Sequence, residues 1–247
     1  GSGAMALAEL ARSPADGSTF YATTPTYIYT SLLSRPPYGY RDVDPLVNMF
    51  TDPELIYTAA DGPFRSLGDV LEKARASRGA WGAANPASLE RQALERLKAV
   101  TGVNAAVISH DGGGDLLINV LNRTLDIGVG EAQELGAQLE AGKLRLLATF
   151  SDRRLARFPE VPTVAELGHE VVVRKFRGFA SPAGLPAEVI RHWERAIPAV
   201  LANPRYQAAY AEDNLRPDFL DHAAYTRFIG EFAGETAAYL RGAGIIE

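Results

Sequence analysis

The chain has 247 residues, a net charge of −5 and a sequence pI near 5.5, and 47% of its residues are apolar. This length and apolar content are ample for a large core or for two lobes, and the absence of a basic stripe argues against nucleic acid or an anionic membrane as partner. No cysteine is present, which excludes disulfides, thiolate metal ligands and cysteine nucleophiles.

The first twelve residues predict the start of a helix, because Ala4, Leu7, Ala8 and Ala11 recur at helical spacing. A doubly wound lobe normally begins with a strand, so we expect either an earlier segment or a cloning remnant in Gly-Ser-Gly-Ala-Met, and apolar continuity favours the earlier segment. Short apolar runs then alternate with amphipathic stretches, which predicts an α/β fold, and several of the runs are apolar without alternation, as parallel strands covered on both faces are. The expected strands are Thr19–Thr23, Leu46–Phe50, Leu55–Ala59, Asn104–Ser109, Asp126–Val129, Leu144–Phe150, Val171–Val173 and Gly178–Ala180.

The helices between these strands carry local start and stop signals. Ser66 and Asp69 have capping-box spacing, and Thr163 and Glu166 repeat it. A helix from Ser88 is expected to end at Gly102, and another to end at Gly142. The chain from Pro186 onward predicts almost continuous helix, with a kink or break at Pro198. We expect this helical tail to pack on the sheet that the N-terminal part begins.

A glycine-rich junction is the most informative local motif. Asp111-Gly112-Gly113-Gly114-Asp115 lies between the strand ending at Ser109 and a helix expected to begin at Leu116. Such a junction can bind an anion through helical N–H groups, although the glycines could equally serve only a tight turn. Asp115 is expected to cap the helix. The motif matches neither a Walker A loop nor a dinucleotide-binding fingerprint.

Two further junctions offer hydrogen-bonding groups. Gly82–Ser88 places Asn85 and Ser88 before a helix, where Ser88 could contact a ligand or act only as the N-cap. Thr23-Thr24-Pro25-Thr26 follows an expected parallel strand, and hydroxyls at such a strand end can bind ligands or simply form a turn.

Catalytic patterns are not found. Arg177, flanked by Phe176 and Gly178, could pair with a carboxylate in a cleft or could be an ordinary surface charge. The four histidines are scattered without metal-binding spacing, and His110 alone lies beside the glycine loop. We therefore expect a protein with no enzymatic activity, no cofactor and no metal.

Read in order, the motifs resemble the receptors of tripartite tricarboxylate transporters, the Bug or TctC-type extracytoplasmic solute-binding proteins. The likeness extends over essentially the whole chain. It is carried by the segments 15–20, 44–47, 51–53, 63–67, 81–82 and 112–114, then by Leu139-Glu140-Ala141-Gly142-Lys143-Leu144-Arg145, Phe158–Glu166, Phe176–Gly178 and Ser181–Pro186.

The resemblance implies a two-lobed type II periplasmic-binding-protein fold with open sheets flanked by helices and a ligand cleft between the lobes. Residues 1–54 plus 181–247 would form lobe 1, and residues 55–180 would form lobe 2, including crossing strands at Leu55–Ala59 and near Phe176–Ala180. It also implies a monomeric receptor in the periplasm that binds a small organic acid, a di- or tricarboxylate or an aromatic carboxylate, and delivers it to membrane permease subunits without involving nucleic acid. The ligand-binding residues implied are Thr23, Thr24, Thr26, Ala84, Asn85, Ser88, His110, Gly112, Gly113, Gly114, Glu131, Phe176 and Arg177.

Two departures from the family pattern stand out. The family's first strand and its glycine-rich ligand loop have no counterpart in this sequence, which leaves open that the chain does not bind at all. His110-Asp111 stands where the family often has Tyr-Lys, which weakens a simple dicarboxylate specificity. The alternative function is an enzyme or ligand-sensing domain on the same fold, for which His110, Asp111 and Glu131 would be the reacting groups.

Overall fold

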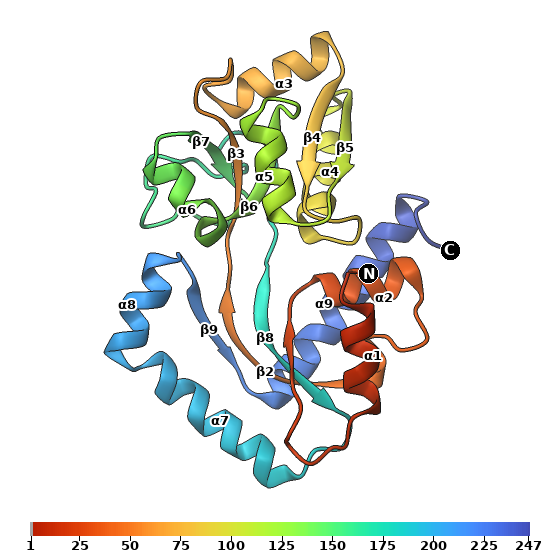
Figure 1. The fold of residues 1–247 in the computed structure, drawn as a ribbon. Coiled ribbons are helices and arrows are strands. Elements are labelled where there is room, and N and C mark those ends of the chain that lie inside the picture. Colours follow the sequence, from red (N-terminus) through yellow and green to blue (C-terminus); the bar gives the residue numbers. More distant parts are fainter. Residues whose placement is uncertain (1) are drawn as a thin grey trace. The chain divides into compact units, whose positions relative to one another are not determined.

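The computed structural model describes residues 2–247 and divides the chain into two compact units. Unit 1 contains the residues up to Thr51, Lys175–Ala211 and Leu215–Glu247, and unit 2 contains Asp52–Arg174 and Glu212–Asn214. Within residues 2–247, no helix has the length and apolar character that crossing a membrane requires. Figure 1 shows the elements of each unit.

Unit 1 is built on a four-stranded sheet in the order β1-β8-β2-β9, and every neighbouring pair is antiparallel. The strands are β1 (Tyr21–Thr23), β2 (Val43–Thr51), β8 (Phe176–Pro182) and β9 (Arg216–Leu220). The helices are α1 (Ala4–Arg12), α2 (Thr26–Ser34), α7 (Ala187–Leu201), α8 (Pro204–Glu212) and α9 (His222–Gly242), with a 3₁₀ turn at Tyr40–Asp42.

Both faces of this sheet are covered. Apolar residues of α1, α2 and α9 pack around Phe176 and Ala180 on one face. Apolar residues of α7 and Tyr210 of α8 pack around Leu46 and Phe179 on the other face. Because residues alternate between the faces of a strand, these two clusters separate cleanly along β8. The expectation that the helical tail packs on the N-terminal sheet is confirmed.

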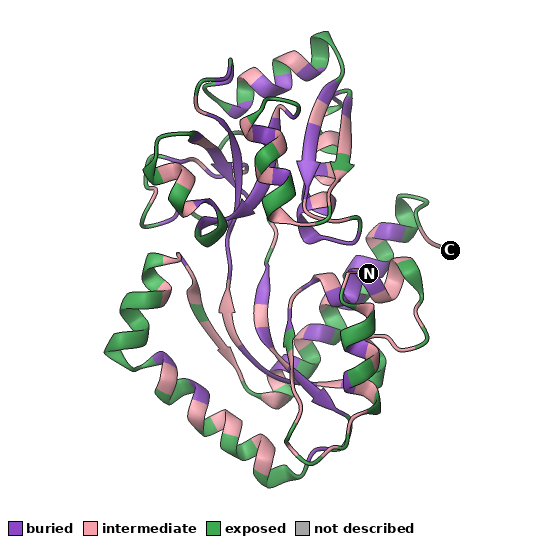
Figure 2. Ribbon diagram, in the orientation of Figure 1, coloured by how far each residue is buried: buried purple, intermediate pink, exposed green. Residues whose placement is uncertain are grey.

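Unit 2 is built on a five-stranded sheet in the order β5-β4-β6-β3-β7. Its strands are β3 (Glu54–Ala59), β4 (Gly79–Ala83), β5 (Ala105–Ser109), β6 (Ile127–Glu131) and β7 (Leu144–Thr149), and its helices are α3 (Leu67–Ala76), α4 (Leu89–Thr101), α5 (Gly113–Leu121) and α6 (Ala132–Glu140). β5, β4 and β6 are parallel, whereas β3 is antiparallel to both β6 and β7. Figure 2 shows that β3, β4 and β6 are almost entirely buried.

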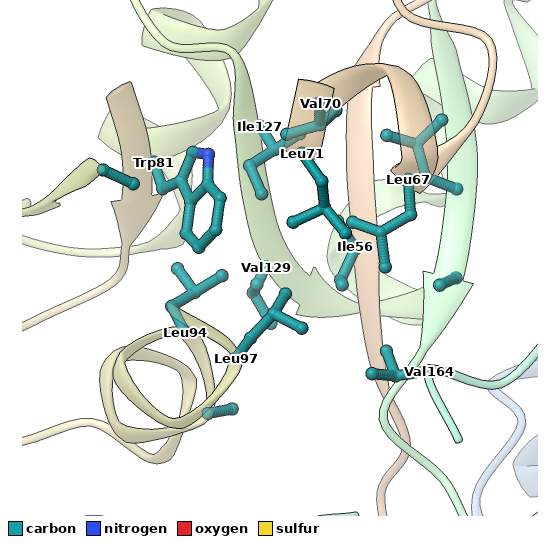
Figure 3. Packing of buried hydrophobic residues seen from close by; sticks show 14 of the residues in the cluster. Ile56, Leu67, Val70, Leu71, Trp81, Leu94, Leu97, Ile127, Val129 and Val164 are labelled. Carbon is teal, nitrogen blue, oxygen red and sulfur yellow. The ribbon is translucent and has the colours of Figure 1, made fainter. Parts of the chain in front are cut away.

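Two cores hold this sheet between its helices. One contains Trp81 with residues of α3 and α4, such as Leu71 and Leu94, and Figure 3 shows Ile127 of β6 between Trp81 and Leu71. The other contains residues of α5 and α6, such as Leu116 and Leu135. Helices on both faces of a sheet with a parallel centre are the α/β layering that the sequence predicts.

The local helix signals are largely confirmed. Ser66 and Asp69 form the expected capping box at the start of α3. Ser88 caps α4 by accepting a hydrogen bond from the Arg91 N–H, and Gly102 ends α4 in the left-handed conformation at φ 64°. The bonds of the Thr163–Glu166 box also form, at 2.8 and 3.0 Å, but only a turn follows them.

Five details of the elements differ from the expectations. β4 was not among the expected strands, and β9 interrupts the region expected to be helical. Val171–Val173 forms no strand: the Val173 N–H donates to Phe150 O, outside any ladder. α5 begins at Gly113 with Gly112 as its N-cap, so Asp115 lies in the first turn and does not cap it. α7 continues through Pro198, so the helix does not break there, while the kink that was the other expectation stays a prediction.

The division of the chain also differs from the predicted lobes at three places, the first being residues 52–54, which group with unit 2 and not with lobe 1. Phe176–Ala180 groups with unit 1, because β8 pairs with β1 and β2 over its length. Glu212–Asn214 groups with unit 2, although its flanking residues belong to unit 1. Gly178 allows β8 to approach β2 this closely, since a Cβ at this position would lie 2.4 Å from Val47 O of β2.

Candidate functional site

The candidate site in unit 2 is the edge of the sheet where β5, β4 and β6 end. These three strands are parallel neighbours, so their last residues, Ser109, Ala83 and Glu131, lie at one edge of the sheet. The His110 N–H donates to Ala83 O at 3.0 Å and so fixes the end of β5 beside the end of β4. Open α/β sheets bind ligands at such carboxyl ends. The structure thus brings together the segments predicted around residues 84, 110–114 and 131.

The loop after β4 is held by its own hydrogen bonds. Asn85 Oδ1 accepts from the Ala87 N–H at 3.1 Å, and the Ser88 N–H donates to Asn85 O at 3.2 Å. Ser88 itself is fully buried, and its hydroxyl accepts from Arg91. Ser88 therefore fixes the start of α4, whereas Ala84 and Asn85 are partly exposed and can meet a ligand.

The glycine loop after β5 leads into the start of α5. Gly112 is the N-cap and provides no side chain to accept hydrogen bonds from the first-turn N–H groups. These N–H groups point outward from the helix and attract negative charge. His110 is partly exposed, although its Nδ1 atom is buried without a hydrogen-bond partner.

An acidic side chain of the protein already lies at this helix start. A Cβ added to Gly113 would lie 2.5 Å from Oε2 of Glu134, and Glu134 is an exposed residue in the first turn of α6. The sequence analysis missed this residue, because nothing in the spacing of Gly113 and Glu134 indicates that α5 and α6 start next to each other. A ligand carboxylate at Gly113 would therefore experience the Glu134 charge.

Three further glutamates lie close together near these strand ends. Glu54, Glu90 and Glu131 are buried, and their carboxylate oxygens lie within 4.8 Å of one another. Glu54 and Glu131 are direct partners in the ladder between β3 and β6. Burial, and then the charges of Glu134, Glu131 and Glu54, raise the pKa of the Tyr57 hydroxyl.

This glutamate cluster has the oxygen-rich composition that hard cations prefer. Each of the three residues, however, also interacts with other groups of the protein, and a cluster of carboxylates does not by itself define a metal site. Its consequence for the candidate site is electrostatic. An anionic ligand at the strand ends needs donors that outweigh the carboxylates nearby.

The threonines predicted in unit 1 follow β1, which is antiparallel to β8 and not a parallel strand as expected. Thr23 is buried, and its hydroxyl is 2.7 Å from the Tyr225 hydroxyl. Thr24 Oγ1 accepts from the Thr26 N–H at 3.1 Å. Thr24 and Thr26 remain partly exposed at the start of α2, while Thr23 serves the core of the unit.

Phe176 and Arg177 lie on opposite faces of β8. Phe176 has an exposed fraction of 0% and forms edge contacts with four aromatic rings, so the structure places it in the core rather than on a binding surface. Arg177 is partly exposed on the face that α7 covers, opposite to the face of Thr23, and it has interactions within the chain. The two predicted positions therefore have different roles.

Two helix-flanked α/β units of this kind define the class of periplasmic binding proteins. The fold matches a periplasmic transporter with a TM-score of 0.91 at 20% identity, over 99% of this chain and 84% of that one. It matches R. palustris Rpa4515 with adipate with a TM-score of 0.90 at 23% identity, over 99% of this chain and 84% of that one. It also matches MatC from Rhodopseudomonas palustris with bound malate with a TM-score of 0.80 at 17% identity, over 100% of this chain and 85% of that one.

The chain belongs to the tripartite tricarboxylate transporter receptor family, whose family model matches residues 1–244. Among curated relatives, a UPF0065 protein of Cupriavidus necator is 26% identical over 99% of this chain and 76% of its own length. Protein BugT of Bordetella pertussis is 25% identical over 95% of this chain and 74% of its own length. The resemblance stated from the sequence is confirmed.

Proposed function

We propose that this protein is an extracytoplasmic receptor that binds a small organic carboxylate and delivers it to a tripartite tricarboxylate-type permease. The observation that carries the proposal is the glycine-rich start of α5 at Gly112 and Gly113, beside the ends of β4 and β6. Family membership supports a receptor rather than an enzyme, and the structural relatives with adipate and malate support a carboxylate as ligand. We propose delivery to the permease and the periplasmic location on the strength of the family.

The unit 2 residues that we assign to the ligand are Ala84, Asn85 and the backbone N–H groups of Gly112–Gly114. Thr24, Thr26 and Arg177 of unit 1 stay predictions as ligand contacts. Glu134 acts on specificity, because its exposed carboxylate lies against Gly113 and repels a second negative charge there. We therefore expect the receptor to prefer a ligand with one carboxylate near α5 and to bind dianions less tightly.

The test is calorimetric titration with adipate, malate and hexanoate of four proteins: the wild type, Asn85→Ala, Glu134→Gln and Gln133→Ala. Asn85→Ala is expected to weaken binding about tenfold, the effect of one lost hydrogen bond to a charged group. Glu134→Gln is expected to tighten dianion binding about fivefold, since like charges about 4 Å apart repel by about 1 kcal/mol when water screens them fully. Gln133, exposed on the same helix, is the matched control and is expected to leave the affinities unchanged.

Each result discriminates. Binding of none of the three acids at millimolar concentration would refute the carboxylate proposal. Binding that is unchanged in Asn85→Ala and Glu134→Gln would place the ligand away from the strand ends of unit 2. Equal effects of Gln133→Ala and Glu134→Gln would show that the Glu134 charge has no specific role.

A further inference from the structure

A cavity lies in unit 2 beside β7, which is the last strand of its sheet. It has a volume of about 630 Å³, and its lining includes Arg65, Leu67, Leu144, Arg145, Leu147 and Phe158. The segment around Pro162 borders it, and the Thr149 N–H donates to Pro162 O at 2.9 Å where this segment joins β7. Its size is within the range of cavities that bind small ligands.

Two guanidinium groups converge at this cavity. Arg65 Nη1 donates to Ala60 O at 3.1 Å and to Gly62 O at 2.9 Å, and Arg145 Nη2 donates to the same Ala60 O at 3.4 Å. The Nε atom of Arg145 is buried and has no hydrogen-bond partner. Two positive charges therefore share one neutral acceptor, and one buried donor is left unsatisfied, which costs free energy.

The neighbouring carboxylates do not form close ion pairs with these two arginines. Within the part of the chain that the structure describes, neither Arg65 nor Arg145 forms an ion pair with a carboxylate. Asp69 lies close to Arg65, but it accepts hydrogen bonds from the backbone N–H groups of Arg65 and Ser66. Glu160 is an exposed lining residue. Two guanidinium groups therefore face one lining carboxylate, Glu160, and the charge of Asp69 beside Arg65, which the Arg65 charge helps to hold ionised.

The rest of the lining is apolar. Leu67, Leu147 and Val161 are buried in the walls, while Leu167 is 41% exposed at the surface. Figure 3 shows Leu67 reaching from α3 toward Ile56 of β3, so this wall is continuous with the core. A flat carboxylate matches the forked geometry of guanidinium donors, and an apolar chain matches leucine walls.

The cavity also accounts for motifs that the candidate site at the strand ends leaves unexplained. The segments 139–145 and 158–166 carry much of the family resemblance, yet Leu139, Leu144, Arg145 and Phe158 line this cavity instead. From the paired guanidinium groups and the apolar walls, we infer that unit 2 has a second binding site, for a monocarboxylate with an apolar chain. This site is separate from the site of the proposed function and does not depend on it.

The probe is octanoate, titrated into the full chain by calorimetry, with butanoate, hexanoate and the neutral octanamide for comparison. Octanoate is expected to bind at least tenfold more tightly than octanamide, because the amide lacks the charge. Affinity is expected to rise about fourfold for each further buried methylene, which corresponds to about 0.8 kcal/mol. Methyl NMR shifts of Leu144 and Leu147 would locate the bound chain.

Arg145→Met and Arg65→Met remove one charge each and retain most of the side-chain volume. Each is expected to weaken octanoate binding at least tenfold, and Arg65→Met keeps the test valid if Arg145→Met fails to fold. Arg75→Met, at an exposed position of α3 outside the cavity lining, is the matched control. Asn85→Ala is expected to leave octanoate binding at this site unchanged, whatever it does to adipate.

Equal affinity for octanoate and octanamide would overturn the inference, as would unchanged binding in both arginine variants. Loss of octanoate binding in Asn85→Ala alone would show that octanoate occupies the strand ends and not this cavity. No binding at millimolar octanoate would also overturn the inference, and it would leave the adipate and malate result of the proposed function untouched.

Discussion

Phe176→Ala tests whether this residue holds unit 1 together or contacts the ligand. Phe176 is fully buried, and its ring centroid lies 5.3 Å from Phe232, 5.5 Å from Phe228, 6.0 Å from Tyr225 and 6.2 Å from Tyr27. Truncating a buried phenylalanine costs about 3–5 kcal/mol through lost burial and the cavity that remains. With four ring partners in edge or T-shaped geometry, we expect the upper half of that range, about 4–5 kcal/mol.

The measurement is thermal and urea unfolding followed by calorimetry and circular dichroism. For a unit of this size, each kcal/mol shifts Tm by about 4 °C, so Phe176→Ala is expected to lower the Tm of the unit 1 transition by about 15–20 °C. Tyr206→Ala, at a position that is 54% exposed in the same unit, is the control and is expected to shift stability by less than about 0.5 kcal/mol.

A ligand-contact role for Phe176 predicts a loss of affinity instead of a loss of stability. If Phe176 contacted ligand, Phe176→Ala would weaken adipate or malate binding at 10 °C while leaving the unfolding transition nearly unchanged. That result would refute the assignment of Phe176 to the core. A large loss of stability with unchanged affinity in the remaining folded protein would support it.

Two more predictions concern stability. Gly82→Ala is expected to lower the free energy of unfolding in urea by about 1–3 kcal/mol, because its Cβ would lie 2.2 Å from Cδ1 of Leu116. Gly136→Ala in α6 has open space around the new Cβ and should stabilise the protein by about 0.5–1 kcal/mol. Equal effects of the two substitutions would contradict this account of the packing. Hydrogen bonds from the Arg65 and Ser66 backbone lower the pKa of the Asp69 carboxyl below its usual 3.8. The ionised Asp69 side chain therefore stabilises the folded protein above pH 3.8, and this stabilisation is lost as the pH falls through the lowered pKa. Asp69→Asn should therefore lose less stability than the wild type between pH 6 and pH 3, and identical losses would refute this.

The local signals in the sequence predicted helix boundaries well. The Ser66–Asp69 box, the Ser88 cap and the Gly102 stop are each decided by hydrogen bonds or backbone angles within four residues. The Thr163–Glu166 box shows the limit of such signals, since its bonds form without a helix after them. A cap fixes where a helix would begin, but a helix also needs an apolar face to pack.

The missed strands have a common cause. β4 has the residues Gly-Ala-Trp-Gly-Ala, whose low strand propensity is overridden because the strand is buried between β5 and β6. β9 contains Pro217, which an edge strand tolerates, and β9 pairs only with β2. In both cases the deciding partner lies far away in the sequence, where periodicity gives no information.

The candidate site could be predicted as a set of junctions, but the roles of its residues could not. The sequence places Asn85, Gly112 and Glu131 after apolar segments, and the parallel order of the strands then brings them to one edge. Whether Ser88 or Thr23 faces a ligand depends on burial, and both hydroxyls are used inside the protein, by Arg91 and by Tyr225. Hydroxyl-rich sequence therefore identifies turn and cap positions more reliably than ligand contacts.

Charge decides what the strand ends of unit 2 can bind. The glycine-rich start of α5 favours an anion, while Glu134 at Gly113 and the buried Glu54, Glu90 and Glu131 oppose one. Helix N-terminal attraction is about 0.3–1 kcal/mol at exposed sites, so a second ligand carboxylate close to Glu134 would cancel it. A receptor of this kind gains affinity from direct hydrogen bonds rather than from net charge. Its selectivity therefore depends on where the second polar group of the ligand lies relative to Glu134, which Glu134→Gln would measure directly.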